Sequence, residues 1–423
     1  MSSELEVWLD CDWCPMQRLG TLIHDRGQVR FQYEKTWLAQ REWAFTIDPQ
    51  LSLDAGSFFP KPDAGNFGVF LDSSPDRWGQ TLMRRREALQ AKDEQRTART
   101  LYAWDFLLGV QDVTRQGALR FRLKNDEMFL ANEVLAAPPI THLAELATIA
   151  KALTRKDIHD IDPLRRWLAV LVAPGASLGG ARPKANFRNK DSSLWIAKFP
   201  AHDDDRNIGA WEGMAWWLAR QVGIDMPPAI VERLTPRAHH TFCVQRFDRI
   251  AGVAANGAEY RRRFYASAMT LLGKRVSEGT SYLELAEFLQ RQGDPHFVQS
   301  DLEQLFLRVA FNVAIGNRDD HLRNHGFILN RRGWRLAPAF DVNPSIDKAE
   351  HVLNIDESDN RPSLETVRAT APFYRLTDER AQEIVGSIVE VASGWKNAAR
   401  RVGIAGAEIE LSASAFGAIH PYV

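Results

Sequence analysis

The chain has 423 residues, of which 45% are hydrophobic and 25% are charged, and its formal net charge is -1 at pH 7. These values exclude a disordered chain, and a near-neutral surface gives no overall attraction to nucleic acid or to a membrane. The length predicts two or three compact units rather than a single core.

The N-terminal stretch has no basic start followed by an apolar core, so we expect no signal peptide. The longest apolar runs, such as residues 167–174, are too short to span a bilayer, so we expect no membrane contact. Three cysteines cannot build a disulfide framework, which indicates a reducing, cytoplasmic setting. Cys11 and Cys14 form a CxxC pair with no second pair of metal ligands nearby, so we expect ordinary residues of an early strand.

The first third of the chain predicts strands followed by a helix. Apolar and polar residues alternate at residues 5–10 and 28–33, which indicates a β-rich opening. The segment SSPDRWGQ, residues 73–80, predicts the start of a helix with its proline in the first turn. The charged run at residues 83–99 is a charged helix face or a solvated connection, and the prolines of residues 135–143 mark a candidate boundary.

Short strands and helices then alternate from about residue 141 to residue 270. Residues 192–200 and 241–249 predict strands, and residues 209–223 predict an amphipathic helix. The apolar face of that helix consists of Trp211, Met214, Ala215, Leu218 and Val222. After about residue 265 the pattern is mainly helical. We therefore expect an α+β protein with an α/β half before an all-α half, in segments 1–135, 136–265 and 266–423.

The segment GNRDDHLRNHGF, residues 316–327, follows an apolar helical run and concentrates the candidate catalytic groups. Asp319 and Asn324 form D-x-x-x-x-N, and Asp341 follows another apolar stretch. Phosphoryl transfer from a nucleotide needs one carboxylate to accept the proton of the attacking hydroxyl. It also needs an amide oxygen and a second carboxylate for Mg²⁺, which prefers oxygen ligands.

Three features upstream stand in the order expected of a kinase. The segment SLGGARPK, residues 177–184, is a glycine-rich loop with a lysine, and its glycines let backbone N–H groups approach phosphate oxygens. It is not a Walker A loop, because Ala185 stands where Ser or Thr is needed. Lys198 lies in a predicted strand, and Glu212 follows on the amphipathic helix, where a lysine–glutamate pair could form.

Other interpretations of the same residues compete with the kinase. A metal hydrolase would use Asp319, Asp320, His321, His325 and Asp341. This interpretation is disfavoured, because no glutamate follows His321 and because Arg318 and Arg323 add positive charge to the segment. A loop of solvated charges is the simplest alternative. A nucleophilic hydrolase is disfavoured, because no G-x-S-x-G is present and Cys243 lies in an apolar strand.

Five ordered motifs resemble those of the HipA family, the serine/threonine kinase toxins of bacterial toxin–antitoxin pairs. The segments are SLGGARPK (177–184), WIAKFP (195–200), VQRFDR (244–249), GNRDDHLRNHGF (316–327) and LAPAFDVNPS (336–345). Residues 70–86 are also similar to the family's N-terminal region. The resemblance covers most of the chain and implies a two-lobed, HipA-like protein kinase fold.

The resemblance implies a role for each matching position. Asp319 would be the catalytic base, rather than Asp320, and Asn324 and Asp341 would hold Mg²⁺. Ser177 would be autophosphorylated, which would silence the kinase. The ATP contacts would be Gly179, Gly180, Ala181, Arg182, Pro183, Lys184, Lys198, Gln245, Arg246, Phe247, His321, Leu322, Arg323, Asn324, Phe340 and Asp341.

Two positions depart from the family pattern. Gln245 stands where the family usually has glutamate, which matters little if the contact to adenine is made by backbone groups. Pro183 removes one N–H that could have met a phosphate. Neither departure affects the three acidic and amide groups of the chemistry.

The function implied is transfer of the ATP γ-phosphate to a serine or threonine of a protein, with an aminoacyl-tRNA synthetase as the expected target and arrest of translation and growth as the result. A helix-turn-helix antitoxin would be the partner, and DNA would be bound only through that complex. Two alternatives remain open. One is a small-molecule phosphotransferase, which would need an acidic pocket for a cationic substrate. The other is a non-catalytic ATP-binding scaffold for an antitoxin or a DNA complex.

Overall fold

The computed structural model describes residues 2–40, 42–131, 137–154, 182–236, 238–251 and 260–422. The chain forms two compact units, Met1–Asp203 with Gln245–Ala266 and Asp204–Val244 with Ser267–Val423. This division differs from the expected segments 1–135, 136–265 and 266–423. Segment 1–135 and most of segment 136–265 share a unit, whereas residues 204–244 of the second segment belong with the C-terminal half.

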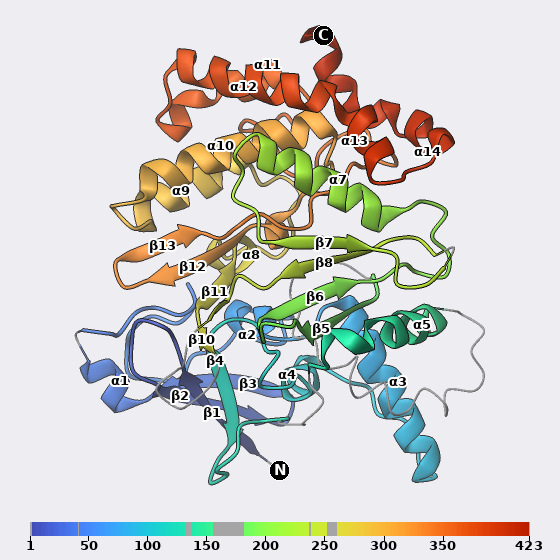
Figure 1. Cartoon of the computed structure of the whole chain (residues 1–423). Helices are drawn as coiled ribbons and strands as arrows, with labels where there is room; N and C mark the ends of the chain where they lie inside the picture. The colour runs from blue at the N-terminus through green and yellow to red at the C-terminus, as the bar shows by residue number, and fades with distance from the viewer. Residues whose placement is uncertain are drawn as a thin grey trace. The chain divides into compact units, whose positions relative to one another are not determined.

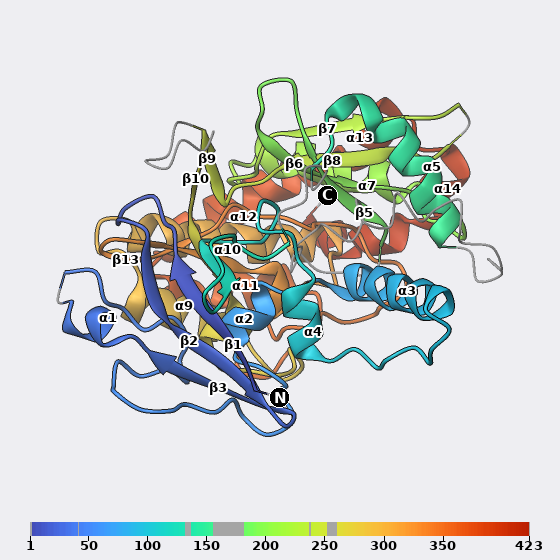
Figure 2. The same ribbon diagram turned by 90° about the horizontal axis from the view of Figure 1, so that it is seen from below.

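The first unit opens with an antiparallel sheet in the order β3-β2-β1-β4, drawn in blue and teal in Figures 1 and 2. Its strands are β1 (Ser3–Leu9), β2 (Gln17–Asp25), β3 (Gln28–Tyr33) and β4 (Leu119–Leu123). Arg26 and Gly27 join β2 to β3 with φ values of 48° and 82°, a two-residue turn that matches the twist of a hairpin. The predicted β-rich opening is confirmed.

The other described elements of the first unit are helices and short strands. They are α1 (Lys35–Ala39), α2 (Gly68–Asp72), α3 (Arg77–Asp93), α4 (Ala103–Leu108), η1 (Ile140–His142), α5 (Leu143–Leu153), β5 (Lys184–Arg188), β6 (Leu194–Lys198), β9 (Arg249–Ala251) and β10 (Tyr260–Arg262). The predicted helix after residue 73 is α3, but its proline lies before the first turn. Asp76 is the N-cap, and its carboxylate accepts from the Gly79 N–H at 2.9 Å.

The second unit is mostly helical. Its elements are α7 (Ile208–Gln221), β7 (Ala229–Glu232), β8 (Thr241–Gln245), α8 (Ala268–Leu271), α9 (Tyr282–Gln292), α10 (Val298–Ile315), η3 (Leu322–Asn324), β12 (Gly326–Asn330), β13 (Gly333–Leu336), α11 (Leu364–Ala369), η4 (Ala371–Tyr374), α12 (Asp378–Ser393), α13 (Trp395–Arg401), α14 (Gly406–Leu411) and η5 (Ala413–Tyr422). Strand β11 (Phe264–Ser267) runs across the boundary between the units, and the last residue of β8, Gln245, belongs to the first unit.

The amphipathic helix explains why residues 204–244 join the C-terminal half. Helix α7 packs against α12 and α13, as Figure 1 shows, and the rings of Trp211 and Trp395 lie 6.2 Å apart. Of the predicted apolar face, Trp211, Met214, Ala215 and Leu218 are buried, whereas Val222 is the half-exposed residue after the last turn. Burial of this apolar face against α12 and α13 stabilises the association of α7 with the second unit.

The C-terminal half is not all-α, and that part of the prediction is wrong. Strands β12 and β13 form an antiparallel hairpin in which Phe327 pairs with Leu336. The apolar runs GFIL and WRLA are each too short for a helical period to be told from a strand. No helix in the described part of the chain is long and apolar enough to cross a membrane.

Candidate active site

The segment that carries the candidate catalytic groups leaves the end of α10, a helix whose last eleven residues are all buried. Gly316 ends the helix in the left-handed conformation, with φ of 66°. A Cβ atom at this position would collide with the carbonyl oxygen of Ala415, so only glycine fits without a shift. The chain therefore turns sharply at Gly316 into a loop that continues through η3 into β12.

The turn gives the two adjacent aspartates opposite environments. The side chain of Asp319 is 64% exposed, whereas Asp320 is 3% exposed. Only Asp319 can therefore present its carboxylate to a molecule in solution. This exposure supports the choice of Asp319 over Asp320 as the candidate base.

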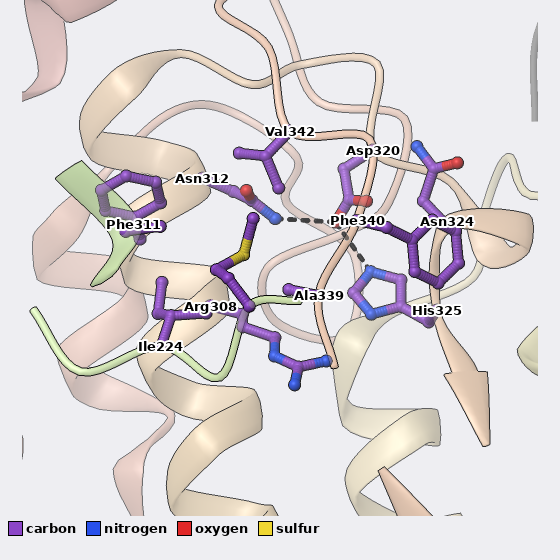
Figure 3. A pocket seen from close by; sticks show the side chains of 12 residues that line it. Ile224, Arg308, Phe311, Asn312, Asp320, Asn324, His325, Ala339, Phe340 and Val342 are labelled. Carbon is purple, nitrogen blue, oxygen red and sulfur yellow. Dashed lines mark hydrogen bonds and ion pairs between the residues drawn. The ribbon is translucent and has the colours of Figure 1, made fainter. Parts of the chain in front are cut away.

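Asp320 is the centre of a buried hydrogen-bond network. Its Oδ2 atom accepts from the Asn312 amide at 2.8 Å and lies 2.7 Å from His325 Nε2 (Figure 3). The same oxygen accepts from the Tyr282 hydroxyl at 2.6 Å. Burial opposes ionisation of Asp320, but His325 and the Tyr282 hydroxyl outweigh it and hold its pKa below the usual value. The same burial, with Asp320 beside it, raises the pKa of Tyr282 well above normal.

The network fixes the loop from the interior. Leu322 adds a second anchor, since it is fully buried and its backbone N–H donates to Ser277 Oγ at 3.1 Å. His325 also accepts a hydrogen bond at its backbone oxygen from the Ala268 N–H. Sequence reasoning offered Asp320 and His325 only as ligands of an alternative metal site. No three His, Cys, Asp or Glu side chains converge as metal ligands within the described ranges.

Asn324 offers an oxygen that suits a cation. Its amide nitrogen donates to the Asp319 backbone oxygen at 3.4 Å, which orients the side chain. Its Oδ1 atom is buried and has no hydrogen-bond partner among the described residues. A buried amide oxygen without a protein partner fits the expected role of a Mg²⁺ ligand.

Asp341 follows β13 in a strained conformation, with φ of 60° at a non-glycine residue. The approach to it is fixed, because the Ala339 N–H donates to the Asp225 oxygen at 2.8 Å. Its neighbours Phe340 and Val342 line a pocket together with Asn324 (Figure 3). The segments that carry the two expected magnesium ligands therefore meet at this pocket.

The pocket has an apolar wall and one buried cation. Ile224 and Phe311 lie on one side, and Arg308 projects from α10 beneath them (Figure 3). Arg308 is 5% exposed, and burial lowers its pKa to about 10, so it stays charged near neutral pH. The lining has Asp320 as its one carboxylate, which already holds three partners. It does not form the acidic pocket expected of a small-molecule kinase for cationic substrates.

The segment after Asp341 is attached to the outer side of the loop. The Ser345 N–H donates to the Gly316 oxygen at 2.8 Å, and the Arg318 guanidinium donates to the Lys348 oxygen at 2.7 Å. These bonds hold the Lys348 ammonium against the Asp319 carboxylate, to which it donates. Sequence reasoning missed Lys348, and no motif in the chain points to it.

In the first unit, two candidate lysines lie opposite one another. Lys184 at the start of β5 and Lys198 at the end of β6 are paired residues of an antiparallel hairpin. Both are buried, and Lys184 Nζ lies 2.6 Å from Asp76 Oδ2 in an ion pair whose side chains are almost fully enclosed. Asp76 therefore balances the charge of Lys184, a partner that sequence reasoning missed. Glu212, the expected partner of Lys198, lies in the second unit.

Among the residues 245–247 expected to contact adenine, Arg246 is held by its side chain. Arg246 is 4% exposed and donates to Asp248 at 2.6 and 2.9 Å and to Asn186 at 3.0 Å. Burial opposes the charge of Asp248, but Arg246 and Arg249 lower its pKa far below normal. The Arg246 guanidinium is therefore structural, which leaves backbone groups for any contact to a nucleotide.

The remaining candidates have simpler surroundings. The Pro183 oxygen accepts from the Phe199 N–H at 2.8 Å, and the Phe247 ring lies 5.9 Å from that of Tyr265. Arg182, Gln245, His321 and Arg323 are half-buried. Ser177, Gly179, Gly180 and Ala181 lie outside the described residues.

Comparison with known proteins gives a consistent result along the chain. The model of the HipA-like C-terminal domain matches residues 176–395, and that of the HipA N-terminal domain matches residues 6–103. A Shewanella oneidensis protein named serine/threonine-protein kinase toxin HipA is 26% identical over 203 residues, 42% of this chain and 45% of that protein. A Haemophilus influenzae protein named as a kinase candidate is 25% identical over 201 residues, 42% of this chain and 57% of that protein.

The alignments thus span about half the length of these two relatives. The fold agrees more completely than the sequences do. In a solved complex of Shewanella oneidensis HipA with HipB and operator DNA, one chain superimposes with a TM-score of 0.66 at 17% identity, covering 98% of this chain and 95% of that one. The α+β, two-lobed fold expected from the sequence is therefore confirmed.

Proposed function

Because this chain belongs to the HipA family, we propose that it is an ATP-dependent kinase that phosphorylates a serine or threonine of a protein. The observation that carries the proposal is the exposed Asp319 carboxylate on a loop that Asp320 fixes from within. The unpartnered Oδ1 atom of Asn324 lies in the same loop. Together these groups match the needs of phosphoryl transfer.

Asp319 accepts the proton of the attacking serine or threonine hydroxyl while the oxygen of that hydroxyl forms a bond to the γ-phosphorus. The bond from that phosphorus to the oxygen of the β-phosphate breaks, and ADP leaves with the electron pair. Asn324 and Asp341 would hold Mg²⁺, which neutralises charge on the phosphates. The buried network around Asp320 keeps Asp319 in place without reorganisation during the reaction.

The first unit supplies the nucleotide contacts in this proposal. Lys198 binds the α- and β-phosphates, and Gln245 to Phe247 receive the adenine through backbone groups. Arg182, Pro183 and Lys184 adjoin the phosphates beside the glycine-rich loop, and Ser177 is the site of inactivating autophosphorylation. Lys184 also has a structural role in this proposal, because it forms an ion pair with Asp76.

The partners follow from the family. The solved relative is bound to HipB and operator DNA, and we propose a helix-turn-helix antitoxin as the partner of this chain, with DNA reached only through the complex. The proposed substrate is a cytoplasmic protein of the translation apparatus, such as an aminoacyl-tRNA synthetase. Its phosphorylation would stop translation and growth.

Intact-mass spectrometry of the whole chain with Mg²⁺ and ATP tests the activity. We expect the gain of one phosphate, mapped to Ser177, and a loss of this gain by roughly a thousandfold in rate in Asp319→Ala. Asp347→Asn, at an exposed position in the attached segment, is the matched control and should behave as the wild type.

Two outcomes would contradict the proposal. Wild-type protein that binds ATP but transfers no phosphate to itself or to a protein would be a scaffold. Transfer to a small molecule alone would identify a small-molecule phosphotransferase.

A further inference from the structure

The turn between β1 and β2 brings two thiols together. The Sγ atoms of Cys11 and Cys14 lie 2.6 Å apart, closer than sulfur atoms in van der Waals contact. Both cysteines are free thiols in this structure. Neither belongs to the site described above. The expectation that they are ordinary residues of an early strand is wrong, since both lie in the turn after β1.

The rest of the turn is fixed around them. The Asp10 N–H donates to the Ala118 oxygen at 2.9 Å, and the Asp10 carboxylate accepts from Arg120 at 3.1 Å. Trp13, between the cysteines, lies 6.2 Å from the ring of Trp43 and 5.7 Å from that of Phe45. The packed scaffold therefore holds the sulfurs close enough to bond without a large movement of the backbone.

The two thiols differ in exposure and in acidity. Cys11 is 7% exposed, whereas Cys14 is half-buried. The hydrogen bond between the sulfurs lowers the pKa of Cys14, and with burial it raises that of Cys11. An accessible thiol with a lowered pKa beside a buried thiol is the arrangement of attacking and resolving cysteines.

We propose that Cys11 and Cys14 are a modification site that forms a reversible intramolecular disulfide by exchange with a low-molecular-weight disulfide such as glutathione disulfide. Cys14 attacks one sulfur of the reagent, and the first glutathione leaves as a thiolate. Cys11 then attacks the Cys14 sulfur of the mixed disulfide and releases the second glutathione. The two protein thiols lose two electrons and two protons, and the reagent gains both. Disulfides of reducing compartments are typically of this transient kind.

Zinc binding is the main competing use of a CxxC pair. It needs two further ligands, and in the described ranges no group of three His, Cys, Asp or Glu side chains can hold a metal. Within the described ranges the two sulfurs therefore lack the further ligands that a four-coordinate zinc site needs.

The test uses the whole chain, reduced and then equilibrated in mixtures of glutathione and glutathione disulfide. Trypsin releases residues 1–18 as one peptide that carries both cysteines, since Arg18 is the first basic residue. We expect this peptide to lose two hydrogen atoms as the mixture becomes oxidising, and to regain them when it becomes reducing.

Variants separate the roles of the sulfurs. Cys11→Ser should accumulate a glutathione adduct on Cys14. Its formation should be about tenfold faster than that of an adduct on Cys11 in Cys14→Ser, because Cys11 is buried. Cys243→Ser is the control and should oxidise as the wild type, since Cys243 is 2% exposed and burial raises its pKa to about 12.

Three results would overturn the inference. The first is a wild-type peptide that stays reduced at every ratio while the urea-unfolded chain oxidises. The second is a stable glutathione adduct on wild-type Cys14. The third is zinc retained by the native chain and lost in both serine variants.

Discussion

The Lys348 ammonium donates to the Asp319 carboxylate across 29 residues of chain. Arg318, the residue before Asp319, donates to the backbone oxygen of Lys348 at 2.7 Å. The loop that carries Asp319 therefore also positions Lys348. The segment after Asp341 therefore brings a positive charge to the candidate base. In a kinase, this is where negative charge on the transferring phosphate would develop.

Replacing Lys348 tests whether that charge contributes to the reaction. Lys348→Met should lower the rate constant of phosphate transfer by about tenfold or more, because a fixed positive charge beside a developing anion stabilises the transition state. Lys348→Arg should keep most of the activity. The measurement is single-turnover phosphate transfer at saturating ATP.

The matched control is Lys396→Met, which removes an exposed lysine from an ion pair with Glu410. Its rate should equal that of the wild type. Equal rates for Lys348→Met and wild type would show that the contact is only a surface ion pair.

Asp320 should matter to stability more than any other residue of the loop. Asp320→Asn should cost roughly 2–4 kcal/mol of unfolding free energy, because its partners are buried and would lose a charged acceptor. Asp319→Asn, at the exposed neighbour, should change stability by less than about 0.5 kcal/mol. Urea denaturation of the three proteins at pH 7 measures both. A similar loss in the two variants would contradict the assignment of separate roles.

The pH dependence of the same network has a definite sign. Because the pKa of Asp320 is lower in the folded chain than its ordinary value of 3.8, ionised Asp320 stabilises the fold above that value. This contribution is lost as the pH falls below 3.8 toward the folded pKa. The stability of Asp320→Asn should therefore fall less steeply than that of the wild type at acid pH.

The loop and the helix before it were predictable, but the contacts that make the loop rigid were not. Helical period and polar spacing were enough to place α10 and to single out Asp319 and Asn324. Asp320 fixes the loop partly through its hydrogen bond with Tyr282, which is 38 residues away in the sequence. No local sequence pattern predicts such a contact. The ion pair of Lys184 with Asp76 and the hairpin β12–β13 were missed for the same reason, since tertiary partners decide them.

His351 should make the second unit sensitive to mild acid. It is 2% exposed, and burial lowers its pKa to about 4, whereas an unfolded histidine has a value near 6.5. Between these values the unfolded chain binds the proton more readily, so stability falls as the pH drops from 6.5 to 4. The loss should be on the order of 3 kcal/mol.

Two variants check this pH effect by urea denaturation at pH 7, 5.5 and 4.5. His351→Gln should flatten the dependence over this range. His420→Gln, at an exposed position, should leave it as in the wild type. A wild-type chain whose stability is constant from pH 7 to pH 4.5 would exclude the effect.

Gly316→Ala should destabilise the chain through two separate effects, which a second glycine can resolve. Both Gly316 and Gly223 have positive φ after a helix, 66° and 86°, but a Cβ atom at Gly223 meets no atom within 4 Å. Gly223→Ala should cost about 1 kcal/mol for the backbone conformation alone. Gly316→Ala should cost at least about 2 kcal/mol more, because the added methyl group collides with the Ala415 backbone. Gly316→Ala should also slow phosphate transfer, since Asp319 lies three residues beyond the turn.

Equal losses of unfolding free energy in the two variants would mean that the loop shifts to accommodate the methyl group and that Gly316 is needed only for its φ value.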